Sequence, residues 1–140
     1  MNIHTCLLFL VVCWPGLAIT QATHPDDPYA EQTIRNTLAL NGVSPSFVEK
    51  DIGRLGDRAA IGLMRVLSEE PLVRPDQLKN ILSILRDAFR VPSIISNEAD
   101  RQPKATLFLL NCLQEQAASR DLRDEISETR TFVSENTKRN

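Results

Sequence analysis

The stretch that decides the fold class is PDQLKNILSILRDAFRV, residues 75–91. Its apolar residues recur at the three- and four-residue spacings that place side chains on one face of an α-helix. They are Leu78, Ile81, Leu82, Leu85 and Phe89. Proline is favoured in the first turn of a helix and breaks its interior. We therefore predict an amphipathic helix that opens at Pro75 and stops near Val91, before Pro92.

The rest of the chain beyond residue 27 follows the same pattern of proline openings, glycine or proline stops and spaced apolar residues. We expect further helices from Pro28 to about Asn41, from Pro45 to Leu55, from Asp57 to before Pro71, from Pro103 to Ala117 and from Asp121 to about Asn136. Asp57, which follows Gly56, is predicted to cap the helix that it opens. No stretch alternates apolar and polar residues as a strand does. The fold is therefore predicted to be all-α.

The chain also contains an internal similarity. Residues 63–85 match residues 91–113 at a constant offset of 28, which aligns Pro75 with Pro103 and Leu85 with Leu113. Fixed offsets are typical of stacked repeats. A proline-opened amphipathic helix gives a similar pattern without repetition, so both interpretations stay open.

The segment LGDRAAIGLMRVL, residues 55–67, followed by the helix to Phe89, resembles the helical hairpin of a HEAT repeat. The resemblance covers about residues 44–118. Its offset of 28 is shorter than the usual HEAT period of about 40 residues. The resemblance implies an irregular stack of helical hairpins that works by binding proteins. A small helical bundle is the alternative architecture.

The N-terminal residues have the features of an export signal. Residues 7–12 read LLFLVV, and no Asp, Glu, Lys or Arg occurs before Asp26. Small residues at Thr20 and Ala22 suit a signal peptidase. We predict a signal peptide over residues 1–22, a flexible segment over 23–27, a helical domain over 28–136 and a frayed tail over 137–140. A membrane anchor and lipidation at Cys13 are the alternatives.

Several chemistries lack the residues that they need after removal of residues 1–22. The remaining histidine would be His24 and the remaining cysteine Cys112. Neither a histidine-based catalytic system nor a four-ligand zinc site is therefore expected, and no cofactor is predicted. Cys112 is expected to be buried, or else to form an intermolecular disulfide. The net charge of −2, from 16 Lys and Arg against 18 Asp and Glu, argues against a nucleic-acid partner.

The candidate partner-binding residues are Lys79, Arg86 and Arg90, which fall on one side of the predicted helix over 75–91. Their spacings of seven and four suit a basic stripe that another protein could contact. The alternative is a solvated face, because Asp76 and Asp87 lie on the same helix.

We therefore expect an exported, non-catalytic protein-binding or adaptor module that displays a rigid helical surface. One alternative is a small exported enzyme or inhibitor that uses carboxylates assembled by the fold. Another is a structural envelope protein that forms a homodimer through an apolar end face.

Overall fold

The computed structural model of the chain describes residues 27–39, 51–69 and 75–138. These residues form α3 (Pro28–Ala39), α5 (Arg58–Leu67), α6 (Pro75–Ala88), α7 (Lys104–Gln116) and α8 (Arg120–Lys138), with two short 3-10 helices, η1 (Pro92–Ile94) and η2 (Glu98–Arg101). None of the described residues forms a strand. The prediction of an all-α fold is confirmed.

Several predicted features fall partly or wholly outside the described residues. The predicted signal peptide, residues 1–22, lies wholly outside them, as do residues 23–26 of the predicted flexible segment, the predicted helix end near Asn41 and residues 139–140 of the predicted tail. Of the predicted helix over residues 45–55 the structure describes residues 51–55, of which 51–53 are helical. Within the described ranges, no helix combines the length and the apolar character needed to cross a membrane.

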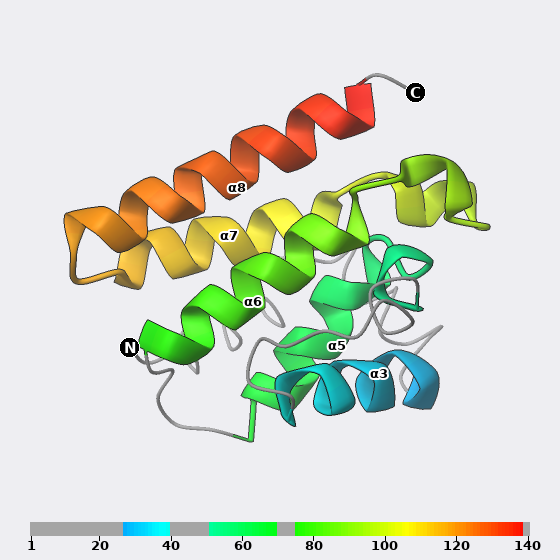
Figure 1. Cartoon of the computed structure of the whole chain (residues 1–140), viewed down its shortest axis with the longest axis horizontal. Coiled ribbons are helices and arrows are strands. Elements are labelled where there is room, and N and C mark those ends of the chain that lie inside the picture. The colour runs from blue at the N-terminus through cyan, green and yellow to red at the C-terminus, as the bar shows by residue number, and fades with distance from the viewer. Residues whose placement is uncertain (1–26, 40–50, 70–74, 139–140) are drawn as a thin grey trace.

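The helices form a packed stack whose outermost member is α8 (Figure 1). Helices α7 and α8 run antiparallel as a hairpin, and α6 also lies along the inner side of α8. Helix α5 contacts α3, α6 and α7, and α3 also contacts α6. Helix α5 therefore joins the N-terminal helix to the C-terminal hairpin.

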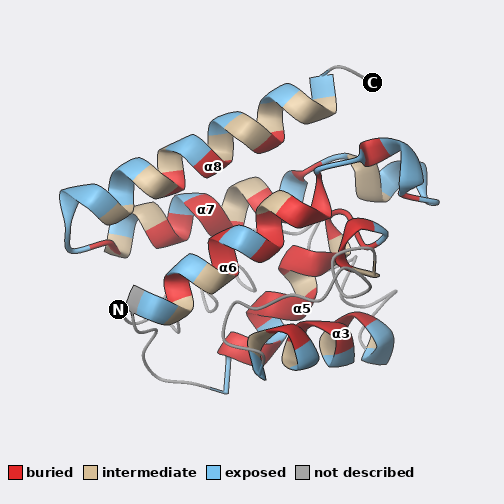
Figure 2. Cartoon of the chain, viewed as in Figure 1, coloured by how far each residue is buried: buried red, intermediate tan, exposed pale blue. Residues whose placement is uncertain are grey.

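The core is built from the apolar faces that the helical spacing predicted. Its largest fully buried side chains come from α3, α5, α6, α7 and the segments beside them, and include Ile34, Leu55, Leu63, Leu78, Ile81, Leu85, Phe89 and Leu109. Figure 2 shows these buried surfaces turned toward neighbouring helices, while much of α8 remains exposed or half-buried. Tertiary packing of these faces, rather than helix propensity alone, stabilises the short helices.

The ends of two helices differ from their predicted positions. Helix α6 ends at Ala88, before the predicted stop near Val91. Phe89 is nevertheless fully buried just beyond the helix. Helix α8 continues to Lys138, past the predicted end at Asn136, so Thr137 and Lys138 belong to a helix and not to a frayed tail. The hydroxyl of Thr137 donates to the carbonyl oxygen of Val133 at 3.0 Å, in the last turns of that helix.

The connection between α6 and α7 contains the two short 3-10 helices η1 and η2. In η2 the Asn97 side chain accepts a hydrogen bond from the Ala99 N–H at 3.0 Å, which caps this short helix. Ile95 is fully buried, whereas Ile94 is 41% exposed. The adjacent isoleucines thus separate into one core residue and one surface residue.

Asp57 caps a helix other than the predicted one. Its side chain makes no capping hydrogen bond to α5, because its backbone is already helical, with φ −65° and ψ −20°. The carboxylate instead accepts hydrogen bonds from the backbone N–H groups of Ala105 and Thr106, at 2.9 and 2.8 Å, and from the Thr106 hydroxyl at 2.8 Å. Asp57 therefore caps the N-terminus of α7, where donors are otherwise unsatisfied.

A second contact holds the same junction together. The Asp57 N–H donates to the carbonyl oxygen of Asp100 at 2.8 Å. Gly56, one residue earlier, has φ +56°, a left-handed conformation that glycine adopts without steric cost. The turn before α5 is thus fixed directly against the segment that leads into α7.

Candidate functional site

The outer side of α7 carries one row of surface residues. Lys104, Asn111 and Glu115 are exposed, and Phe108 is half-buried among them. Their spacings of four, three and four place them on one face of the helix. The opposite side of α7 contributes buried residues such as Leu109 and Leu113 to the core. Phe108 also packs partly against that core.

Helix α8 presents a basic edge beside this row. Arg120 and Arg123 are exposed near its start, and Arg130 is half-buried seven residues after Arg123. Arg130 donates from Nη2 to the side-chain oxygen of Gln114 on α7. The Gln114 side chain in turn donates to the Ser127 hydroxyl at 2.7 Å. These bonds fix the two helices relative to each other at the middle of the hairpin.

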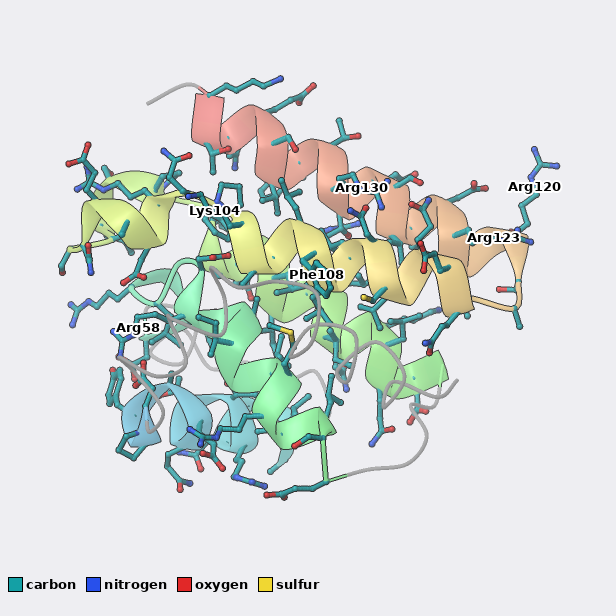
Figure 3. All side chains as sticks on the ribbon, turned by 180° about the vertical axis from the view of Figure 1, so that it is seen from behind. Arg58, Lys104, Phe108, Arg120, Arg123 and Arg130 are labelled. Atoms are coloured by element: carbon teal, nitrogen blue, oxygen red, sulfur yellow. The ribbon has the colours of Figure 1, made fainter. Side chains whose placement is uncertain are left out.

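We name Lys104, Phe108, Asn111, Arg123 and Arg130 the α7–α8 face. Figure 3 shows the order of its labelled residues along the hairpin: Lys104, then Phe108, then Arg130, then Arg123, with Arg120 at the end. In the same view Phe108 lies at the edge of α7 away from α8, whereas Arg130 and Arg123 lie on α8. The face combines one half-buried aromatic side chain with positive charge on a chain whose net charge is −2.

The opposite edge of α8 is acidic. Asp121, Asp124 and Glu128 are exposed there. Glu128 lies toward α6, because one of its carboxylate oxygens is 4.0 Å from Nη2 of Arg86. Helix α8 therefore separates its charges into a basic edge toward α7 and an acidic edge toward α6 and solvent.

The predicted binding residues Lys79, Arg86 and Arg90 are placed differently from one another. Lys79 is exposed on α6. Arg86 is half-buried and donates from Nε to the Thr129 hydroxyl at 3.0 Å. Arg90 lies beyond the end of α6 and donates to Asp87 at 2.7 Å, with 65% of its side chain exposed. Two of the three basic side chains, both of them guanidinium groups, are thus already engaged within the chain.

Arg58, whose place beside the Gly56 turn made it a further candidate for a partner-facing patch, makes an ion pair with Asp27. Its guanidinium donates to both carboxylate oxygens, with the Nη2–Oδ1 distance at 2.7 Å. The hydrogen bond to Asp27 raises the pKa of Arg58, so its charge is retained. Asp27, which the predicted flexible segment over 23–27 includes, also accepts from the Ala30 N–H at 3.1 Å and thereby caps α3.

Asp57 is the described carboxylic acid whose titration is most perturbed. Burial raises the pKa of Asp57 to about 6 although its three hydrogen bonds act in the opposite direction, and the nearby charge of Asp100 raises it further. The donors of α7 engage both of its carboxylate oxygens. We therefore assign Asp57 a capping role, and its raised pKa is the consequence of burial.

The remaining candidate groups within the described ranges are clusters of metal-ligating side chains and the Cys112 thiol. Those residues contain no group of three or more His, Cys, Asp or Glu side chains arranged to hold a metal ion. Cys112 is 8% exposed, as predicted for a cysteine beside the apolar stripe of α7. A buried thiol of this kind behaves as a small apolar side chain.

Sequence analysis missed the α7–α8 face because its residues come from two helices. The spacing of Lys104 and Phe108, and that of Arg123 and Arg130, could have indicated one surface row on each helix. The antiparallel packing that brings the rows together depends on tertiary contacts such as that of Gln114 with Arg130.

Comparison with known proteins finds no family model, no curated protein and no solved structure that matches this chain.

Proposed function

We propose that this chain is an exported, non-catalytic protein-binding module and that the α7–α8 face is its contact surface. One observation carries the proposal: the hairpin of a net-acidic chain presents Lys104 and Arg123 as exposed basic residues with Arg130 half-buried beside Gln114, on the same two helices as the half-buried Phe108. Aromatic and arginine side chains are enriched at protein interfaces, whereas a solvated helix face needs neither.

The construction of the hairpin supports this proposal. The Gln114, Ser127 and Arg130 side chains bond across α7 and α8, and Asp57 anchors the start of α7. A surface held in this way loses little conformational entropy when a partner binds. In this proposal the stacked helices are a rigid support, as the HEAT resemblance implies, and Lys79 on α6 is outside the contact.

Site-directed photo-crosslinking tests the proposed surface. A photoreactive amino acid at Asn111, which is exposed within the α7–α8 face, is expected to give an adduct of one defined mass with another protein. The matched probe at Ser83, which is exposed on α6, is expected to give none. The Asn111 adduct should disappear when Arg123 is changed to Glu.

Other results would contradict this proposal. Adducts at Ser83 equal to those at Asn111 would show that the hairpin is not the contact surface. An adduct with twice the mass of the chain would favour the homodimer alternative. A crosslink that survives Arg123→Glu would remove the basic edge from the binding surface.

Export is a separate part of the proposal and has a separate test. The uncharged apolar segment before Asp26 supports it. The intact mass of protein recovered outside the cytoplasm should correspond to residues 23–140. A mass that includes residues 1–22 would contradict the predicted cleavage, and an added lipid mass at Cys13 would favour lipidation.

A further inference from the structure

The connection between α6 and α7 presents two aliphatic side chains at the surface. Val91 and Ile94 are 47% and 41% exposed, whereas Pro92 and Ile95 are buried. The Ile94 N–H donates to the carbonyl oxygen of Val91 at 3.1 Å, which closes one turn of 3-10 helix. Residues three apart in such a turn lie on the same side of it. Val91 and Ile94 therefore form one outward apolar pair, which we name the η1 tip.

The η1 tip belongs to a projecting part of the molecule. Figure 1 shows the connection between α6 and α7 extending past the ends of both helices. The other large apolar side chain that is exposed among the described residues is Tyr29, on α3. An isolated apolar side chain at the surface needs no explanation, whereas a contiguous pair on a projecting turn marks a contact with another surface.

We propose that the η1 tip binds the surface of an anionic lipid bilayer, with Val91 and Ile94 in the headgroup region and nearby basic side chains against the lipid phosphates. The contact is peripheral and reversible. It uses a surface other than the α7–α8 face and is tested separately from the proposed function.

Basic side chains flank the η1 tip. Ile94 packs over Gly53, because its Cδ1 atom lies 3.1 Å from the position of a Cβ there, and Arg54 is the next residue. Arg90 immediately precedes the tip and keeps 65% of its side chain exposed while it donates to Asp87 at 2.7 Å. Both arginines are therefore close enough along the chain to accompany the tip into contact with headgroups.

The exposed charges at this end of the molecule are mostly positive. In residues 51–58 and 90–104 they are Arg54, Arg90, Lys104 and Glu98. The half-buried charges of the same ranges are balanced, with Asp51 and Asp100 against Arg58 and Arg101, and the buried Asp57 is engaged by α7. Figure 3 shows Arg58 and Lys104 toward the end where the connection projects. An anionic surface that meets the tip therefore encounters net positive charge.

The backbone of the tip is also suited to contact with lipid. The bilayer interior offers no hydrogen bonds, so backbone groups that approach it need partners within the protein. The Ile95 N–H donates to the Pro92 carbonyl oxygen at 3.1 Å, and the Ile95 carbonyl oxygen accepts from Nε of Arg101 at 3.0 Å. Pro92 itself has no N–H. These bonds lower the cost of removing the turn from water.

The size and charge of the tip argue against a second copy of the chain as its occupant. Stable protein interfaces bury about 1,200 Å² or more, and two partly exposed aliphatic side chains supply a small part of that area. Two tips in contact would also bring Arg54 and Arg90 of both copies together, and like charges oppose binding. A bilayer accepts a convex tip without a matching pocket, and anionic lipids add attraction to the small apolar contact.

Tryptophan fluorescence tests the tip directly. Residues 23–140 include every described residue and lack both tryptophan and the apolar stretch 7–12, which would itself bind lipid. In this chain Ile94→Trp places one tryptophan at the tip, and Ser83→Trp places one at an exposed position of α6 as the control. With phosphatidylglycerol vesicles we expect the Ile94→Trp emission to move to shorter wavelength and to be quenched by brominated acyl chains. The Ser83→Trp emission should not change.

Lipid composition and salt test the charge complementarity without a change to residues 23–140. Vesicle cosedimentation should show binding to phosphatidylglycerol about fivefold or more tighter than to phosphatidylcholine, since one basic residue near an anionic surface contributes about that factor. Added sodium chloride should weaken the binding, because salt screens exposed charges.

Three variants separate the apolar contribution from the charged one. Val91→Ser with Ile94→Ser should weaken vesicle binding about tenfold or more, because it removes the exposed apolar area. Arg54→Glu should weaken binding about fivefold or more. Lys79→Glu makes the same change in charge at the far end of α6 and should alter binding by less than about twofold, because salt screens a distant charge. Circular dichroism confirms that each variant keeps the helical content of the parent.

Four results would overturn the inference: no binding at millimolar phosphatidylglycerol, equal binding to the two lipids, equal losses for Arg54→Glu and Lys79→Glu, or an unshifted Ile94→Trp emission on vesicles that bind the protein. An emission shift that appears without vesicles as the protein concentration rises would instead assign the tip to a second copy. A crosslink from Ile94 to another protein, with no vesicle binding, would assign it to a protein partner. None of these results alters the interpretation of the Asn111 crosslink.

Discussion

At position 56 the chain has no room for a side chain. A Cβ atom on Gly56 would lie 2.3 Å from the carbonyl oxygen of Asp100, and the φ of +56° is strained for other residues. We therefore expect Gly56→Ala to lower the free energy of unfolding by about 2 kcal/mol or more, from backbone strain together with displacement of the 97–102 segment. Urea unfolding measures this difference.

Gly53 provides the matched control for this substitution. A Cβ there would meet the end of the Ile94 side chain at 3.1 Å, and that side chain is at the surface and can move. Gly53→Ala should therefore change the free energy of unfolding by less than about 1 kcal/mol. Equal losses at the two glycines would contradict the assignment of strain to Gly56.

The raised pKa of Asp57 gives stability a defined pH dependence. The carboxyl titrates at about 6 in the folded chain and at its ordinary value of 3.8 when unfolded, so the folded state binds the proton more tightly between these values. The contribution to stability is therefore complete below pH 4 and is lost as the pH rises through 6. The full difference is on the order of 3 kcal/mol.

Asp57→Asn tests this dependence, because asparagine does not titrate. Urea unfolding of the parent at several pH values from 4 to 7 should show a loss of stability with rising pH that the variant lacks. The difference between the two curves isolates Asp57 from the other acids. Parallel curves for parent and variant would show that Asp57 does not titrate in this range.

At the level of elements, one side chain joins α3 to α5. Asp27 caps α3 through the Ala30 N–H and pairs with Arg58 on α5. Asp27→Ala removes both interactions and should cost about 1–2 kcal/mol of unfolding free energy, since loss of a cap alone costs about 1. Asp27→Ser should recover part of this loss, because serine restores the cap without the ion pair. Thermal unfolding followed by circular dichroism gives the comparison, and equal losses for the two variants would assign the whole effect to Arg58.

The identity of the helices could be predicted from sequence because local signals determine it. Pro28, Pro75 and Pro103 mark helix starts that the structure bears out to within a residue, and the apolar spacing identifies Leu85 and Leu109 as core residues. These signals act within a few residues of the position that they affect. They specify which face of each helix is apolar.

The placement of Asp57 could not be predicted from those signals. Its neighbours, Gly56 and Arg58, suggested a cap for the next helix, whereas its partners Ala105 and Thr106 lie nearly fifty residues away. The hydrogen bond from Arg86 to the Thr129 hydroxyl could not be predicted for the same reason, because the two residues lie 43 positions apart. Contacts between distant segments depend on how helices pack, and helical spacing alone does not determine that packing.

At the scale of the whole molecule, one core should give one unfolding transition. Residues 23–140 contain no tryptophan and one tyrosine, Tyr29 on α3, so tyrosine fluorescence reports on α3 while circular dichroism reports on all helices. Because α3 packs on α5 and α6, we expect the two signals to change at the same urea concentration. Separate midpoints would show that α3 unfolds independently.

Phe89→Ala should shift both transitions together. Phe89 is fully buried where α6 meets the rest of the core, and its carbonyl oxygen accepts from Asn136 of α8 at 3.2 Å. Removal of such a side chain costs about 3–5 kcal/mol, a large part of the stability of a small domain. Val91→Ala, at a position that is 47% exposed, is the control and should cost less than about 1 kcal/mol.

The Asp57 junction also limits how this chain could be shortened or rearranged. In a true repeat array each unit contacts its neighbours, so a unit can be deleted or duplicated and the remainder still stacks. Here the carboxylate that completes α7 is supplied from the start of α5, with α6 and both 3-10 helices between them. A fragment that ends before Lys104 would keep the buried Asp57 carboxylate but lose the N–H donors of Ala105 and Thr106. A fragment that begins after Asp57 would leave the N-terminus of α7 without its cap. We therefore expect residues 27–138 to fold as one unit, so that removal of a whole hairpin would destabilise what remains, unlike the loss of one unit from a solenoid.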